Sequence, residues 1–209
     1  MRTIIPGPPG TGKTHTLIHK HLHNELYTHK TDPAKIAYIT FSNAATKEAK
    51  ARIHRAYPQF QFEHISTMHA MGTRALGIDT NTQLLEGKNW NGFKNFSVVC
   101  NDMSFENTQY ESGFKEYKNN YMKIIEYARA KRLDVLEAAT ELELDIYIDD
   151  NLLLQIEQDL RDYKEFYDMY EFSDMLTKFV EKKLCQSLDV VFLDEAQDLN
   201  PLQWKMFYY

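Results

Sequence analysis

The chain has 209 residues and a formal net charge of −6 at pH 7, with 43% hydrophobic and 26% charged residues. This composition is typical of a soluble globular protein with one sizeable core, or with one domain that carries an insertion. The negative charge excludes a basic field over the whole surface, so any contact with nucleic acid must be local.

The two cysteines, Cys100 and Cys185, lack the spacing of a metal site or a disulfide framework, which favours a reducing compartment. No run approaches the roughly 18 apolar residues that would span a bilayer, and the first residues do not resemble a signal peptide. We therefore expect no membrane partner and a cytoplasmic location, or the host cytoplasm if the gene is viral.

The first part of the chain alternates strand and helix patterns. Residues 3–5 and 35–40 are apolar runs that predict buried strands. Each is followed by residues that share one helix face at helical spacing, namely Leu17, Ile18, His21, Leu22 and Leu26, and then Ala45, Ala49 and Ile53. This order predicts an α/β fold in which parallel strands are flanked by helices.

The pattern changes after residue 78. Residues 79–95 predict loops, a helix is expected near 173–184 with Ser173 as its N-cap, and two apolar stripes between them predict long amphipathic helices. The stripes, interpreted as core packing, are Phe114, Tyr117, Tyr121, Ile124 and Ala128, and Leu153, Ile156, Leu160, Tyr163 and Tyr167. We expect a core of residues 1–78 and 185–209, and a mainly helical insertion of residues 79–184.

The last part of the chain returns to a strand pattern. Residues 188–193 form an apolar run broken once, which is typical of a central parallel strand, and the run stops at Asp194. Asn200 followed by Pro201 predicts the start of another helix.

The run GPPGTGKT at residues 7–14 matches the phosphate-loop pattern G-x-x-x-x-G-K-[ST] in full. Glycines allow backbone N–H groups to wrap phosphates, the lysine is expected to reach the β- and γ-phosphates, and the threonine hydroxyl is expected to ligate Mg²⁺. The alternative is a glycine-rich turn without a ligand. The predicted nucleotide-binding residues are Gly7, Pro8, Pro9, Gly10, Thr11, Gly12, Lys13 and Thr14.

Two adjacent carboxylates follow the predicted strand 188–193. Asp194 is placed to hold Mg²⁺, directly or through water, and Glu195 is placed to orient and deprotonate the attacking water. The alternative is a solvated acidic turn, because Asp198 also lies close by.

Four further segments resemble superfamily 1 DNA helicases of the UvrD/Rep kind. DEAQD at 194–198 is similar to the family's DExQD-type motif, and ITFSNAA at 39–45 to its TFTNKAA-type segment. ISTMH at 65–69 resembles the T-F-H segment, and YEFSDML at 170–176 resembles D-F-x-D-L-L, with Glu171 in place of Asp. The segments follow the family's order, and the resemblance covers nearly the whole chain.

The resemblance implies a RecA-like phosphate-loop core with a helical insertion, which uses ATP and Mg²⁺ and has single-stranded DNA as its partner. Gln197 would sense the γ-phosphate and couple hydrolysis to DNA. Phe41 would stack on a base, Asn43 would contact the strand, and His69 would lie near the DNA path. The alternative for Phe41 is a core position, and for His69 a hydrogen-bonded structural histidine.

Two departures from the family concern completeness. The family's adenine-reading glutamine segment has no counterpart in the six residues before Gly7, so adenine specificity stays open. The family also has a second RecA-like domain whose arginines complete the ATP site. We expect that missing domain in a longer protein, and we expect this chain alone to hydrolyse ATP slowly without unwinding. The resemblance suggests 3′→5′ movement and leaves the oligomeric state unknown.

Weaker signals and other functions remain. Residues His15, His19, His21, His23 and His29 favour a solvated helix face, because no carboxylate or cysteine joins them in a zinc pattern. Residues 129–132 contain three cations that form either a solvated face or phosphate contacts. The alternative functions are a phosphate-loop kinase or nucleotidase, and a nucleotide-gated DNA-binding module without helicase activity.

Overall fold

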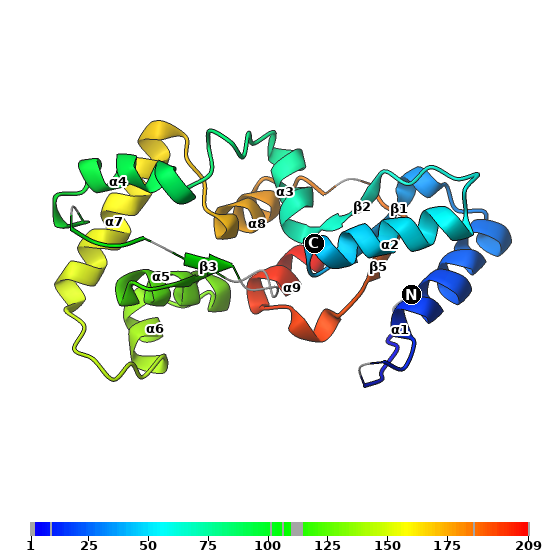
Figure 1. Ribbon diagram of the computed structural model, residues 1–209, viewed down its shortest axis with the longest axis horizontal. Coiled ribbons are helices and arrows are strands. Elements are labelled where there is room, and N and C mark those ends of the chain that lie inside the picture. Colours follow the sequence, from blue (N-terminus) through cyan, green and yellow to red (C-terminus); the bar gives the residue numbers. More distant parts are fainter. Residues whose placement is uncertain are drawn as a thin grey trace. The chain divides into compact units, whose positions relative to one another are not determined.

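The computed structural model describes residues 3–8, 10–100, 102–105, 107–109, 115–185 and 187–208. The chain divides into two compact units (Figure 1). Unit 1 comprises Met1–Met71 and Cys185–Leu199, and unit 2 comprises Gly72–Leu184 and Asn200–Tyr209.

Unit 1 contains a small sheet and the helices next to it. Its elements are α1 (Lys13–Thr16), η1 (Leu17–Leu22), η2 (Glu25–His29), η3 (Pro33–Lys35), β1 (Ile36–Thr40), α2 (Asn43–Ala56), β2 (His64–Thr67), the start of α3 (Met68–Leu76), β5 (Val190–Leu193) and η6 (Ala196–Asp198). The helix that begins with α1 continues through π-helical turns in η1 and η2.

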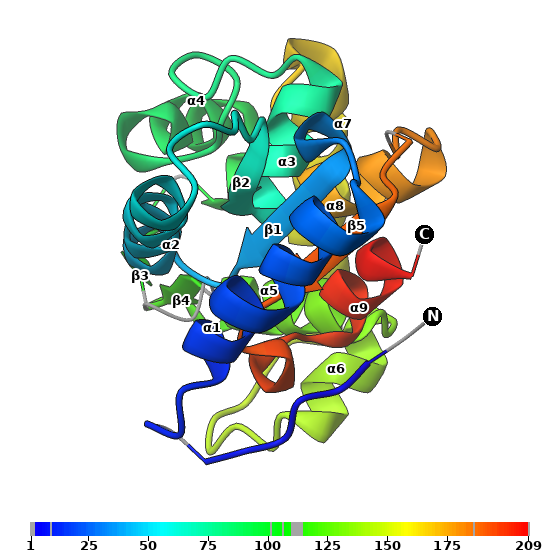
Figure 2. The ribbon, with the colours of Figure 1, turned by 90° about the vertical axis from the view of Figure 1, so that its right-hand side faces the viewer.

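The sheet of unit 1 is parallel, in the order β2-β1-β5. All five residues of β1 are buried, and helices cover the face that carries Ile36 and Tyr38. Ile18 from η1 and Ile53 from α2 belong to the same core cluster. The helix α2 lies next to β1 (Figure 2). The predicted α/β class, a parallel sheet flanked by helices, is therefore confirmed.

Two strand predictions were wrong in detail. Residues 3–5 form no strand, and Ile4 is 88% exposed. A run of three residues that ends at Pro6, which has no backbone N–H, offers few ladder hydrogen bonds to offset the cost of ordering. The strand predicted at 188–193 is shorter, and it lies at an edge of the described sheet with β1 as its neighbour rather than in the centre.

Unit 2 is mainly helical. Its elements are η4 (Gly87–Asn89), α4 (Trp90–Phe96), η5 (Val98–Cys100), β3 (Asn107–Gln109), β4 (Lys115–Tyr117), α5 (Asn120–Lys131), α6 (Val135–Glu141), α7 (Asp150–Tyr167), α8 (Phe172–Glu181) and α9 (Pro201–Phe207), besides the end of α3. No helix among the described residues is long and apolar enough to cross a membrane.

The helix α7 confirms most of its predicted stripe, since four of the five positions are buried and Tyr167 is half exposed. The stripe predicted from 114 to 128 begins too early. Asn119 accepts hydrogen bonds from the first backbone N–H groups of α5, so the helix starts there. Tyr117 accordingly lies in β4, while Phe114 lies outside the described residues.

Two local predictions in unit 2 were also wrong. The region 79–95, predicted as loops, contains the start of α4, which forms because Trp90 and Phe93 bury one face in the core. Ser173 lies inside α8 and does not cap it. Glu171 is the N-cap, and it exchanges side-chain and backbone hydrogen bonds with Asp174 in a capping box. The helix start predicted at Asn200 and Pro201 is confirmed, since Asn200 is the N-cap of α9 and Pro201 is its first residue.

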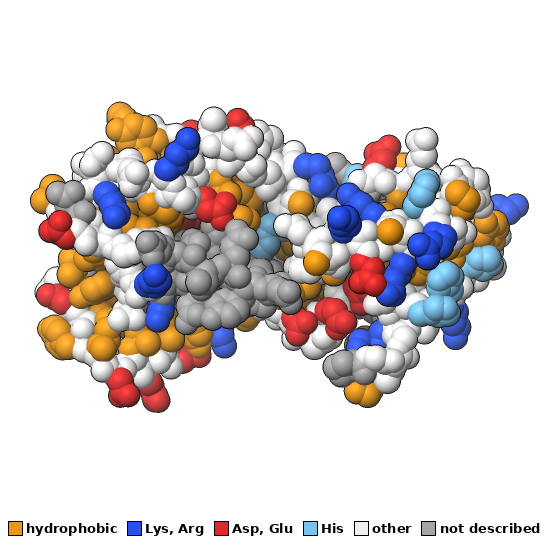
Figure 3. Space-filling view, viewed as in Figure 1, with side chains coloured by type: hydrophobic (Ala, Val, Ile, Leu, Met, Phe, Trp, Pro, Cys, Tyr) orange, Lys and Arg blue, Asp and Glu red, His pale blue; other side chains and the backbone are white. Residues whose placement is uncertain are grey.

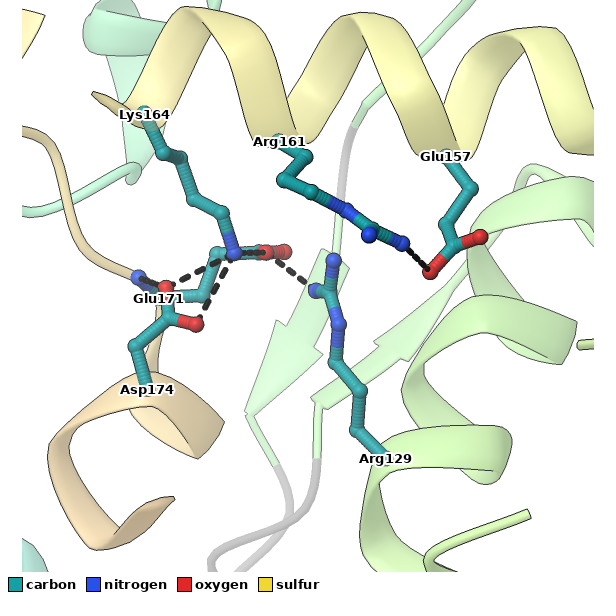
Figure 4. Close-up of polar contacts among 6 residues, drawn as sticks. All are labelled: Arg129, Glu157, Arg161, Lys164, Glu171 and Asp174. Atoms are coloured by element: carbon teal, nitrogen blue, oxygen red, sulfur yellow. Dashed lines mark hydrogen bonds and ion pairs between the residues drawn. The ribbon is translucent and has the colours of Figure 1, made fainter. Parts of the chain in front are cut away.

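A buried ionic network ties three helices of unit 2 together (Figure 4). The Glu171 carboxylate, with its side chain 3% exposed, pairs with Arg129 from α5 and lies 2.8 Å from Lys164 Nζ of α7. Lys164 also donates to Asp174 at 2.8 Å. Arg129, the first cation of the basic cluster, is therefore engaged within the protein.

Candidate nucleotide and metal site

The phosphate loop has a backbone that requires glycine. Gly10 and Gly12 have φ angles of 80° and 79°, a region that other residues rarely adopt, and Gly12 is the N-cap of α1. A Cβ atom on Gly7 would lie 2.6 Å from Thr11 Oγ1. Thr11 in turn donates to the Pro8 carbonyl at 2.8 Å. Pro9 lies outside the described residues.

The ammonium group of Lys13 is bound by carbonyl oxygens of the phosphate loop. Lys13 Nζ donates to the carbonyl oxygens of Gly7 at 3.0 Å and Pro8 at 3.2 Å. The side chain thus folds back from the first residue of α1 across the loop. These bonds are exposed, so an anion with stronger acceptors can compete for the ammonium group.

The sheet and the loop meet at a pair of oxygen atoms. Thr14 Oγ1 donates to Asp194 Oδ2 at 2.9 Å, which joins α1 to the residue that follows β5. Asp194 is 8% exposed, and its Oδ1 accepts the Glu195 backbone N–H at 3.2 Å. A hydroxyl and a carboxylate are hard oxygen donors of the kind that Mg²⁺ takes, so the donor set fits this ion.

A third hydroxyl meets the same carboxylate oxygen. Tyr38 OH donates to Asp194 Oδ2 at 3.0 Å from the centre of β1. Burial and the neighbouring Asp194 carboxylate raise the pKa of Tyr38 well above its ordinary value, so the phenol stays protonated. Tyr38 was not predicted from the sequence as a site residue, although a tyrosine inside a strand of aliphatic residues and threonine was a usable signal.

The two predicted hydrolytic residues lie in the turn after Asp194. Glu195 has a φ of 56°, a left-handed conformation that costs a non-glycine residue roughly 1–2 kcal/mol. The Gln197 amide donates to Glu195 Oε2 at 2.6 Å and to Asp198 Oδ2 at 3.4 Å. Glu195 is half-buried and Gln197 is exposed, so both carry polar groups that solvent or a ligand can reach.

The three predicted DNA-contacting residues follow parallel strands. Phe41 comes directly after β1, Asn43 opens α2, and His69 is the second residue of α3, which follows β2. Because the carboxyl ends of parallel strands share one edge of a sheet, these residues lie at the same edge as Asp194. Asn43 is exposed, whereas Phe41 and His69 are half-buried.

The histidines of the first helix pack against each other and against tyrosines. The rings of His15 and His19 lie 4.4 Å apart, and those of His23 and Tyr27 lie 4.5 Å apart. Figure 3 shows histidine side chains gathered over the helices of unit 1. Within the described part of the chain, no group of three or more His, Cys, Asp or Glu residues is placed to hold a metal ion.

The fold and the loop together define the class of the protein. A parallel sheet flanked by helices, with a G-x-x-x-x-G-K-T loop that opens a helix, is the arrangement of the phosphate-loop NTPases. The sequence matches the family described as UvrD/REP helicase N-terminal domain over residues 2–209, and the chain belongs to this family. No curated protein matches the sequence.

Family membership confirms the resemblance found in the sequence. It assigns the chain to the ATP-binding motor part of UvrD-like helicases and implies that it binds ATP and nucleic acid. ATP use in such motors is coupled to Mg²⁺.

Proposed function

We propose that this chain is the motor core of a DNA helicase, which couples ATP hydrolysis to movement along single-stranded DNA in the 3′→5′ direction. The observation that carries the proposal is the 2.9 Å contact between Thr14 and Asp194, which lies beside a complete phosphate loop in a chain of the UvrD/REP family. In this proposal residues 1–78 and 185–209 form the motor core, and residues 79–184 form its helical insertion.

The phosphate loop and the oxygen pair bind the triphosphate. Backbone N–H groups of residues 7–12 and the start of α1 surround the β- and γ-phosphates, and Lys13 exchanges its two loop carbonyls for phosphate oxygens. Thr14 and Asp194, whose side-chain oxygens lie 2.9 Å apart, would hold the Mg²⁺ ion. When bound, this ion neutralises the charge that develops on the phosphate oxygens.

Glu195 and Gln197 act in hydrolysis. Glu195 accepts a proton from the water whose oxygen attacks the γ-phosphorus, while the bond from that phosphorus to the β–γ bridging oxygen breaks, which leaves ADP and phosphate. The amide of Gln197, which reaches Glu195 Oε2 at 2.6 Å, turns toward the γ-phosphate and reports its presence. The strained φ of Glu195 is consistent with a functional turn.

The DNA strand follows the carboxyl edge of the sheet. Phe41 stacks on a base and Asn43 donates to the strand, while His69 lies beside its path. Ser42 supports this arrangement because its hydroxyl accepts the Ala45 backbone N–H at 3.1 Å and so fixes the start of α2. Stacking on an aromatic ring tolerates any base, as a translocating motor requires.

The proposal is tested by the ATPase rate of the 209-residue chain with and without single-stranded DNA, with Glu195→Gln as the inactive reference. We expect ATP hydrolysis that single-stranded DNA accelerates and that the variant lacks. Binding of both ligands without any hydrolysis would instead identify a nucleotide-gated DNA-binding module. Phosphoryl transfer to a small acceptor, with no response to DNA, would identify a kinase.

A further inference from the structure

The Asp194 carboxylate is held by donors from two different elements. Its Oδ2 accepts the Thr14 hydroxyl of α1 at 2.9 Å and the Tyr38 hydroxyl of β1 at 3.0 Å. Tyr38 is 1% exposed, whereas the bond from Thr14 is only partly buried. The carboxylate is therefore fixed from inside the sheet as well as from the loop.

The register of the sheet explains how Tyr38 reaches this oxygen. Tyr38 pairs with Phe192 across β1 and β5, and their rings lie 6.1 Å apart. Asp194 comes two residues after Phe192, so its side chain points to the same face. The Tyr38 hydroxyl thus reaches the carboxylate that follows β5, and the core holds Tyr38 in place within β1.

The two donors differ in what they do when a metal ion is bound. The Thr14 hydroxyl would itself be a ligand of that ion in the proposed site, whereas Tyr38 serves only as a hydrogen-bond donor to the carboxylate. Tyr38 is buried behind the carboxylate and keeps its bond. A neutral phenol also orients the carboxylate without removing the negative charge that attracts the ion.

We propose that Tyr38 is a positioning residue that holds the Asp194 carboxylate in place for the Mg²⁺ ion of the nucleotide site. The inference rests on the proposed function, since it requires Asp194 to be the metal ligand. It assigns a role in metal affinity to a residue of the central strand that lies outside every sequence motif described above.

The test measures binding of a fluorescent ATP analogue to the full chain while Mg²⁺ is titrated, and again in EDTA. In Tyr38→Phe we expect the Mg²⁺ concentration at half-maximal binding to rise about tenfold, the equivalent of one hydrogen bond to a charged group. Affinity in EDTA should stay that of the parent. Tyr57→Phe is the matched control, because Tyr57 is also buried and donates to the Ile18 carbonyl at 2.8 Å, away from Asp194.

The outcomes separate the inference from the proposed function. If nucleotide binding to the parent chain does not depend on Mg²⁺, the proposed metal site is wrong, and the role of Tyr38 with it. A Mg²⁺-dependent parent with an unshifted midpoint in Tyr38→Phe overturns only the role of Tyr38, as does an equal shift in Tyr57→Phe. If Tyr38→Phe does not fold, Tyr38→Met must show the shift, and failure of both variants to fold would make the hydroxyl structural and overturn the inference.

Discussion

Thr14 and Asp194 are 180 positions apart in the chain, and their side-chain oxygens lie 2.9 Å from each other. One belongs to the helix that the phosphate loop opens, and the other follows the strand β5. Hydrophobic packing does not explain this contact, since both side chains are polar. The contact brings together two hard oxygen ligands beside a loop built for phosphates, which is why it carries the functional proposal.

Lys13→Ala should weaken binding of ATP by about ten- to a hundredfold. The variant lacks the ammonium group that would donate to the phosphates, and a hydrogen bond from a charged group contributes roughly 1.5–3 kcal/mol. Equilibrium titration with a fluorescent nucleotide measures the change. Lys20→Ala removes a charge of the same kind from an exposed position of the same helix and should leave the affinity unchanged. Equal affinities for all three proteins would remove Lys13 from the site.

Glu195→Gln should retain binding of ATP and Mg²⁺ and lose hydrolysis by roughly a hundredfold or more, because the amide keeps the shape of the side chain and lacks the base. The measurements are nucleotide affinity and single-turnover hydrolysis. Glu63→Gln changes an exposed carboxylate of the same unit and should hydrolyse ATP like the parent. Normal turnover by Glu195→Gln would move the base to another residue.

Phe41→Ala should weaken binding of single-stranded DNA by about 1–3 kcal/mol, with little change in ATP affinity. The reason is loss of one ring that stacks on a base at the carboxyl edge of β1. Phe60→Ala, which removes another half-buried ring of unit 1, serves as the control for indirect effects on the core. Fluorescence anisotropy with a labelled oligonucleotide decides the matter, and an unchanged DNA affinity would return Phe41 to a packing role.

Lys164→Met should lower the free energy of unfolding of the chain by about 3–5 kcal/mol, because it leaves buried carboxylates with one cation fewer. Arg161→Met is the control. It breaks an exposed pair with Glu157 on the same helix (Figure 4) and should cost about 0.5 kcal/mol or less. Urea denaturation followed by circular dichroism measures both, and similar losses in the two variants would show that the network adds no stability.

The same network predicts a pH dependence. Burial raises the pKa of Asp174. The nearby charges of Lys164 and Arg129, together with hydrogen bonds to the carboxylate, lower this pKa by more, so it lies below its ordinary value. A depressed carboxyl pKa stabilises the folded state above the unfolded pKa of about 3.9, and this contribution is lost as the pH falls through the folded pKa. The parent should therefore lose more stability than Lys164→Met below about pH 4, and parallel pH profiles would contradict this account.

The sequence predicted the glycine-dependent conformation of the loop, which depends on local spacing. The positive φ angles at positions 10 and 12 require glycine, so the motif specifies the loop conformation independently of the rest of the fold. It did not predict that residues 3–5 stay outside the sheet, because pairing depends on neighbours that a short apolar run cannot specify. Tyr38 was missed for a related reason, since its importance comes from the register between β1 and β5.

The metal site formed by Thr14 and Asp194 is tested by calorimetric titration of a non-hydrolysable ATP analogue into the parent chain and into Asp194→Asn, each with and without Mg²⁺. We expect Mg²⁺ to tighten binding to the parent by about tenfold or more, because Asp194 and Thr14 would hold the ion, and we expect little or no Mg²⁺ effect on the variant. If Mg²⁺ has the same effect on both proteins, or no effect on the parent, the Thr14–Asp194 pair is not the metal site and the motor proposal loses its main support.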